Sequence, residues 1–167
     1  MPRNRSDPAH PTMRTEVRVA NRQRRLPVDR ERAVRVAVFA LESLGQAGSE
    51  LSVVFVSDQA IRRLNRAYLG RHHATDVLAF SQREGEGWTH YPAVLGDVII
   101  SAETAAAQAK ERDTSLREEL DLLLIHGILH LIGYEHTAAR EEARRMARKQ
   151  GELFRKVQKR FPARQKS

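Results

Sequence analysis

A mainly apolar run that ends in "HGILHLIGYEH", residues 126–136, constrains the fold more than any other part of the sequence. Ser115 and Glu118 stand three residues apart just before the run, and this spacing is typical of a capping box that starts a helix. Gly133 comes near its end and is the residue type that most readily ends a helix in a left-handed conformation. The sequence therefore predicts a central helix against which the rest of the domain packs.

Strand and helix patterns follow one another along the rest of the chain. Strands are expected at residues 15–21, 51–57, 76–80 and 94–100, which alternate in polarity or are rich in β-branched side chains. Helices are expected at residues 28–44, in a short stretch from 58, at 102–112, along the apolar run and from 137 to about 160. This order predicts an α+β fold, with a small mixed sheet of about four strands packed by about five helices.

The chain of 167 residues is long enough to form one domain with a hydrophobic core. Residues 1–13 hold three prolines and little that a core could bury, so we expect a disordered basic segment there. We expect a single domain over residues 14–160 and a basic tail over residues 161–167.

The net charge of +8 is distributed unevenly. Residues 1–35 carry ten Arg against four acidic residues, and residues 137–167 carry eleven Lys or Arg against three Glu. Residues 36–136, by contrast, have a net charge of −6. Basic ends can simply keep a protein soluble, or they can attract the phosphate backbone of a nucleic acid. The sequence leaves both interpretations open.

No sequence feature points to a membrane or to secretion. The N-terminal residues are charged but lack the apolar core of a signal peptide, and no apolar run is long enough to span a bilayer. The chain has no cysteine, which excludes disulfides and thiolate metal ligands and fits a reducing compartment. We expect a soluble, cytoplasmic protein.

Three histidines in the quoted segment have the spacing of metal ligands. His126 and His130 are four residues apart, so on a helix they project from one face. A turn at Gly133 would let the chain fold back and bring His136 to the same point. Three imidazoles leave a fourth position for water, as in a catalytic zinc site, so we expect one Zn²⁺ per chain at the C-terminal end of the central helix. The alternative is that they are ordinary core and surface residues.

The residue after the first histidine argues against a peptidase. Metzincin peptidases follow H-E-x-x-H-x-x-G-x-x-H, and the glutamate is their general base. Gly127 occupies that position here. The ligand spacing is therefore kept, whereas the proteolytic base is missing.

With these residues described, the chain resembles the YbeY family of bacterial endoribonucleases. "HGILHLIGYEH" matches the family signature H-G-x-L-H-L-x-G-Y-D-H with Glu135 in place of Asp, and "LNRAYLGRHHATDVLAF" (64–80) and "LGDVIIS" (95–101) match two further blocks. The resemblance covers about residues 50–137 and does not include the basic ends. It implies zinc bound by His126, His130 and His136, an RNA substrate, expected to be ribosomal precursor RNA, and contact with the small ribosomal subunit.

The chain departs from the family pattern in the first of these blocks. Leu69 stands where the family often has an Arg implicated in RNA cleavage, and Arg71 lies two residues further on. His72 replaces a common Asp, Ala74 a Pro, and Ala79 a Ser. These changes leave the predicted zinc ligands intact but weaken any transfer of catalytic detail.

Arg71 and Glu135 are the candidate catalytic residues. Arg71 could stabilise the charge that develops on a phosphate, or it could be a solvated loop charge. Glu135 could act as a base or orient a ligand histidine, or it could be an exposed turn residue. Asp76 and Asp97 could reach the site, although capping of turns is the more common use of such residues. A further set in the loop between the last two strands, Trp88, His90 and Tyr91, could stack on bases or pack locally.

The resemblance thus implies a zinc-dependent, single-strand-specific endoribonuclease that acts in ribosomal RNA processing, including maturation of the 3′ end of 16S ribosomal RNA, and in ribosome biogenesis or quality control. Leu69 favours one alternative, an RNA-binding ribosome-assembly factor with weak or no nuclease activity. A second alternative is a metallohydrolase that acts on a small substrate.

Overall fold

The computed structural model describes residues 13–83, 93–134 and 139–163. In this part of the chain, four strands and five helices follow one another in the predicted order. They are β1 (Glu16–Asn21), α1 (Arg30–Ser43), β2 (Glu50–Val56), α2 (Asp58–Leu69), β3 (Val77–Ser81), β4 (Val94–Ser101), α3 (Ala102–Glu111), α4 (Leu116–Leu131) and α5 (Arg140–Arg160). The predicted α+β class is confirmed.

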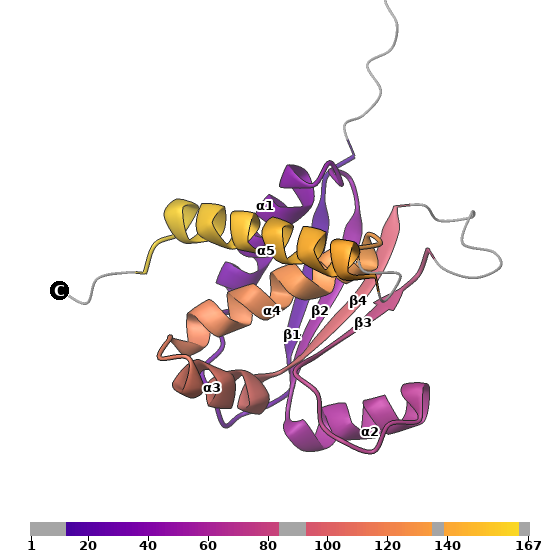
Figure 1. The fold of residues 1–167 in the computed structure, drawn as a ribbon, viewed down its shortest axis with the longest axis vertical. Coiled ribbons are helices and arrows are strands. Elements are labelled where there is room, and N and C mark those ends of the chain that lie inside the picture. Colours follow the sequence, from indigo (N-terminus) through magenta and orange to yellow (C-terminus); the bar gives the residue numbers. More distant parts are fainter. Residues whose placement is uncertain (1–12, 84–92, 135–138, 164–167) are drawn as a thin grey trace, which may run out of the picture.

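The strands form one mixed sheet in the order β1-β2-β4-β3 (Figure 1). β1 and β4 run parallel to β2, whereas β3 runs antiparallel to β4, with Val77 opposite Ile100 and Ser81 opposite Gly96. A Cβ atom at Gly96 would overlap the carbonyl oxygen of Phe80, so only glycine lets β3 approach β4 this closely. Because β3 comes last in the order of the strands, it is an edge strand with one unpaired side.

Helices cover the two faces of the sheet unequally. Alternate residues of a strand point to opposite faces. On one face, Val53 and Phe55 of β2 pack with buried residues of α1, α4 and α5. On the other face, Val56 and Leu78 pack with Ile61 of α2. Figure 1 shows α2 apart from the other helices.

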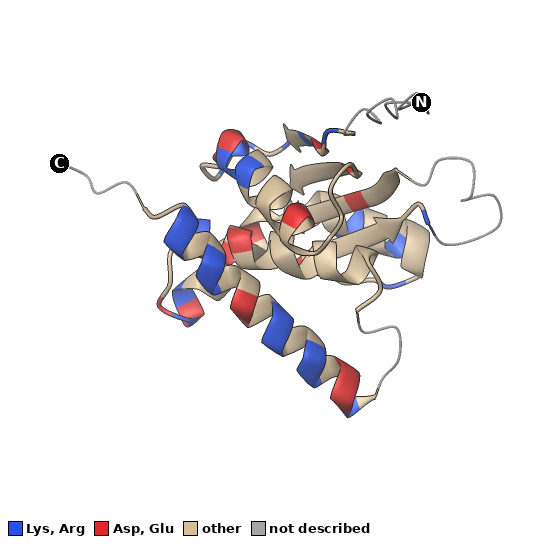
Figure 2. Ribbon diagram, turned by 90° about the horizontal axis from the view of Figure 1, so that it is seen from above, with Lys and Arg blue, Asp and Glu red and all other residues tan. Residues whose placement is uncertain are grey.

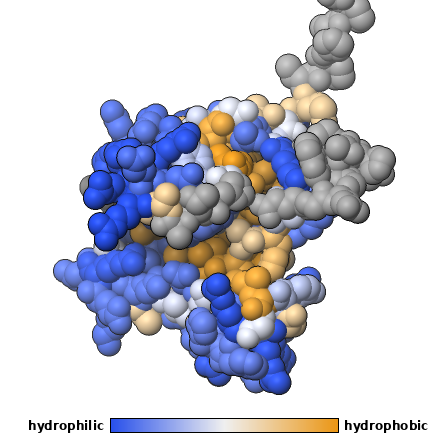
Figure 3. All heavy atoms as spheres, turned by 45° about the vertical axis from the view of Figure 1, so that its right-hand side comes forward, coloured by the Kyte–Doolittle hydropathy of each residue, from blue (hydrophilic) through white to orange (hydrophobic). Residues whose placement is uncertain are grey.

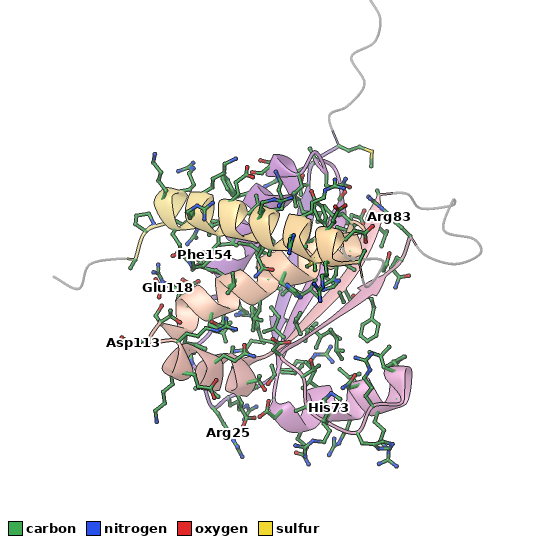
Figure 4. All side chains as sticks on the ribbon, in the orientation of Figure 1. Arg25, His73, Arg83, Asp113, Glu118 and Phe154 are labelled. Atoms are coloured by element: carbon green, nitrogen blue, oxygen red, sulfur yellow. The ribbon has the colours of Figure 1, made fainter. Side chains whose placement is uncertain are left out.

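α4 is the central helix that the sequence predicted. Ten of its residues are buried, and the Ser115–Glu118 capping box is present at its start. Figure 4 labels Glu118 at the N-terminal end of α4. α5 crosses over α4 and buries Met146, Leu153 and Val157, while Lys and Arg follow one another along its length (Figures 1 and 2).

A buried ion pair joins α1 to α4 and to the end of α5. Nη2 of Arg32 donates to Oδ2 of Asp121 at 2.8 Å, and Nε2 of Gln158 donates to the same oxygen at 3.0 Å. Nη1 of Arg32 donates to the carbonyl oxygen of Phe161 at 2.8 Å. Arg32 and Asp121 are only 6% and 4% exposed. Loss of either charge would therefore leave the other one buried without a partner, which destabilises the fold.

The predicted C-terminal tail begins with a packed residue. The ring of Phe161 meets that of Phe39 edge to face, with centroids 5.9 Å apart. Phe161, which follows directly on the last turn of α5, therefore packs against α1 and the core. Among the described residues, none of the helices is both long and apolar enough to cross a membrane.

Candidate functional site

The two histidines of α4 meet near its C-terminal end. Nε2 of His126 lies 3.0 Å from Nε2 of His130, and the ring centroids are 4.6 Å apart. Two nitrogen ligands that each lie about 2.0 Å from one tetrahedral zinc ion are about 3.3 Å from each other. The facing Nε2 atoms therefore fit the donor set of a single metal ion.

Gln150 of α5 holds the first of these rings. Its Oε1 lies 2.6 Å from Nδ1 of His126. An amide oxygen can only accept a hydrogen bond, so Nδ1 carries a proton in this contact, and in the neutral ring Nε2 then keeps its lone pair. No sequence pattern identified Gln150, because it is one of many polar residues on a charged helix and its partner lies 24 residues away.

The end of α4 turns the chain back, as predicted. Gly133 has a φ of +101°, which side chains other than that of glycine adopt reluctantly. The N–H of Gly133 donates to the carbonyl oxygen of His130 at 3.1 Å, and that of Tyr134 donates to Leu129 at 3.0 Å. These two bonds hold Gly133 and Tyr134 against the last turn of α4.

Several candidates from the sequence lie outside the described residues. These are His136, Glu135, Trp88, His90 and Tyr91. Within residues 13–83, 93–134 and 139–163, no three His, Asp or Glu side chains converge as a metal site would require. His136 as the third ligand and Glu135 as a catalytic residue thus stay predictions.

A cleft of about 400 Å³ opens beside the histidine pair. Its walls are the end of α2, the loop that follows α2, the edge strand β3, and the end of α4 with Tyr134. The N–H of Ser101 donates to Asp76 and that of Gln82 donates to Leu95, which sets the antiparallel pattern. In that pattern Ala79 turns its backbone N–H and C=O to the free edge of β3. Figure 4 labels His73 in the loop between α2 and β3, and Arg83 two residues after the end of β3.

Hydrogen bonds position the loop that carries Arg71. Gly70 ends α2 in the left-handed region, at a φ of +64°, and its N–H donates to the carbonyl oxygen of Arg66. The N–H of Arg71 donates to the carbonyl oxygen of Asn65 at 3.3 Å. The buried side chain of Asn65 donates from Nδ2 to the carbonyl oxygen of His73 at 2.9 Å. Arg71 therefore lines the same cleft as the histidines from an anchored loop.

Asp76 lines the cleft and also accepts a hydrogen bond from the backbone of the next residue. Its Oδ1 accepts from the N–H of Val77 at 2.8 Å, and its Oδ2 accepts from Nε2 of Gln108 at 3.2 Å. Glu119, buried in α4, accepts from Nη1 of Arg112 at 2.9 Å. Burial raises the pKa of Glu119, Arg112 opposes this shift, and the charge of Asp76 adds to it. Asp76 thus lines the cleft and also bonds to the backbone at the start of β3, and the sequence had left these two uses open.

Asp97 does not line this cleft. It lies within β4, opposite Ser52 of β2 and Phe80 of β3. Its neighbour Val98 packs in the core that contains α4, so Asp97 faces the other side of the sheet. The expectation that Asp97 caps a turn is wrong, because the position is in the middle of a strand.

The structure also explains why the metzincin glutamate is absent. A Cβ atom at Gly127 would lie 2.6 Å from Cγ1 of Val98 and 3.3 Å from Cγ2 of Val77. This position of α4 therefore packs directly against the sheet, and it has no room for a side chain. A glutamate there could not act as a general base in the cleft.

Comparisons with known proteins place these features in a family. Residues 18–158 match the sequence profile described as "Endoribonuclease YbeY". This range extends well beyond residues 50–137, from which the resemblance was inferred, and it includes most of α5.

Individual relatives match over most of their length. A protein named Endoribonuclease YbeY from Geobacter metallireducens is 50% identical over 140 residues, which cover 83% of this chain and 93% of the relative. The one from Aquifex aeolicus is 38% identical over 148 residues, 89% of this chain and 97% of the relative. The solution structure of TM1509 from Thermotoga maritima covers 88% of this chain and 91% of its own, with a TM-score of 0.59 and 23% identity. This last likeness supports the fold.

Proposed function

Because this chain belongs to the Endoribonuclease YbeY family, we propose that it is a zinc-dependent endoribonuclease that cleaves single-stranded RNA. The proposal that the protein binds zinc depends on one observation: the Nε2 atoms of His126 and His130 lie 3.0 Å apart beside an open cleft. The relatives' names support the reaction, which hydrolyses a phosphodiester bond.

His126 and His130 would hold the zinc ion through their Nε2 atoms, with His136 as the proposed third ligand. Gln150 keeps the proton of His126 on Nδ1, so that Nε2 is available as a ligand. A bound zinc would supply a Lewis acid that polarises a phosphodiester oxygen or lowers the pKa of water.

The place of Arg71 in the cleft supports a role at the reacting phosphate. It lines the same cleft as the histidine pair, and its loop is held by Asn65. A guanidinium group can form paired hydrogen bonds to phosphate oxygens and stabilise the negative charge that develops on them. We propose that Arg71 takes the role of the arginine that Leu69 replaces.

We further propose that the substrate is ribosomal precursor RNA, including the 3′ end of 16S ribosomal RNA, and that the protein acts in the cytoplasm and meets the small ribosomal subunit. The support is the resemblance of the histidine motif and of residues 64–80 to the family. The Lys and Arg residues along α5 suit a polyanionic partner of this kind (Figure 2).

One alternative has a specific observation in its favour. Leu69 lines the cleft and is 50% exposed, so an apolar side chain stands where the family often has a cation. An assembly factor that binds RNA without cleaving it would tolerate this change. Incubation of the zinc-loaded protein with ribosomal RNA fragments separates the two functions. We expect cleavage in single-stranded segments, whereas binding without cleavage would establish the alternative.

The role of Gln150 yields a prediction on metal affinity. Partners that orient a ligand histidine typically contribute about 10–100-fold to affinity, so Gln150→Ala should weaken zinc binding by about that factor. Gln150→Glu should retain most of the affinity, because a carboxylate also accepts from Nδ1 of His126. Competition with a chromogenic chelator measures both. Equal affinity in Gln150→Ala and the wild type would remove Gln150 from the metal site.

A further inference from the structure

Exposed apolar side chains gather at the end of α2, beside the histidine cleft. Tyr68 is 69% exposed and Leu69 is 50% exposed, and Leu69 lines the cleft. The ring of Tyr68 rests against Phe80 of β3, with centroids 5.4 Å apart and planes inclined by 58°. Figure 3 shows apolar surface in the hollow between α2 and the rest of the molecule. A solvent-facing ring held by a second ring is suited to stack on a planar ligand.

Cations continue this surface along α2. Arg62 and Arg66 lie seven and three residues before Leu69, so they share one side of the helix with it. Both are exposed, as is Arg71 beyond the helix end. In the described part of the chain, no carboxylate forms an ion pair with any of these three arginines. The side of α2 that leads to the cleft is therefore cationic, although residues 36–136 as a whole have a net charge of −6.

We propose that this end of α2 binds an unpaired nucleotide of an RNA strand, with its base stacked on Tyr68 and neighbouring phosphates held by Arg62 and Arg66. This inference rests on the proposed function and extends it to the way in which the substrate is selected. Two features identify the occupant as single-stranded RNA: the unpaired cations complement phosphates, and the surface is continuous with the cleft of the histidine pair. A base inside a duplex cannot present its face to Tyr68, so the surface selects unpaired segments.

The test compares Tyr68→Ala with Tyr68→Phe in the full chain. Binding of a fluorescent single-stranded oligoribonucleotide and of its duplex is measured by anisotropy, with chelator present so that nothing is cleaved. Loss of one stacked base should weaken single-strand binding by about tenfold in Tyr68→Ala and leave duplex binding unchanged. Tyr68→Phe should bind like the wild type, because it keeps the ring. Because Tyr68 is largely exposed, both variants should fold, which circular dichroism checks.

A second series shows whether the lost contact is to a base. The oligoribonucleotide carries one abasic position, moved along the strand. For wild-type protein, one position should weaken binding by about tenfold, and for Tyr68→Ala the same position should have no further effect. Additive losses at every position would mean that Tyr68 does not contact a base.

The cations are tested by the salt dependence of binding. Arg66→Gln should make the plot of log affinity against log salt shallower by about 0.7 for one lost single-strand phosphate contact. Arg35→Gln on α1 makes the same change of charge on an exposed residue that does not line the cleft, and its slope should equal that of the wild type.

The outcomes separate this inference from the proposed function. If the wild-type protein binds no RNA, the proposed function fails and this inference fails with it. If it binds and cleaves RNA but Tyr68→Ala binds single strands as well as the wild type does, only the inference is overturned. Equal losses for single strand and duplex would also overturn it.

Discussion

Replacing His130 with alanine is expected to release zinc and to reduce RNA cleavage by at least about a thousandfold. Removal of one of the three proposed imidazole ligands would open the metal site, and a metal ion contributes several kcal/mol to stabilisation of the transition state in such reactions. His126→Ala should have the same effect, since the two Nε2 atoms face one another at 3.0 Å. Elemental analysis and single-turnover cleavage of the same preparations measure both quantities.

His73→Ala is the matched control for these histidine variants. His73 is exposed, and only its backbone carbonyl takes part in the loop next to the cleft. Its zinc content should equal that of the wild type. Full zinc occupancy in His126→Ala and His130→Ala alike would show that the metal is bound elsewhere.

Asp121→Ala is expected to lower the free energy of unfolding by about 3–5 kcal/mol, the usual cost of leaving one partner of a buried ion pair without the other. The guanidinium of Arg32 would stay buried between α1 and α4 and would keep only its bond to the carbonyl oxygen of Phe161. Urea unfolding followed by circular dichroism measures the change.

Two variants show whether burial is the cause. Glu16→Ala removes a similar ion pair with Arg18, in which the side chains are 51% and 79% exposed, and should cost less than about 1 kcal/mol. The double variant Arg32→Met with Asp121→Leu removes both charges and should recover much of the stability. A loss in Asp121→Ala no larger than that in Glu16→Ala would contradict the account of the core.

Local patterns predicted the elements and part of the site. The Ser115–Glu118 capping box and the apolar run defined α4, and the spacing of four residues placed His126 and His130 on one face. These features depend on residues close in sequence, for which helix geometry alone determines proximity. The order of the strands, β1-β2-β4-β3, depends on pairing between distant segments, and the sequence patterns did not specify it.

Long-range contacts account for what the sequence missed at the site. Gln150 reaches His126 only because α5 crosses over α4, and this crossing has no local pattern. The exposure of Tyr68 depends on its position at the end of α2 beside β3, which the sequence patterns did not specify. The average charge of residues 36–136 concealed the cationic side of α2, because Asp58 at its start is the only acidic residue of this helix.

Titration of the metal-stripped protein with zinc tests the central claim most directly. The protein is freed of metal with a chelator, dialysed, and assayed for cleavage of a single-stranded ribosomal RNA fragment as zinc is added. The account predicts no cleavage without metal and a rise in rate that reaches its plateau at about one zinc per chain. Cleavage at the full rate by protein shown by elemental analysis to lack metal would contradict it.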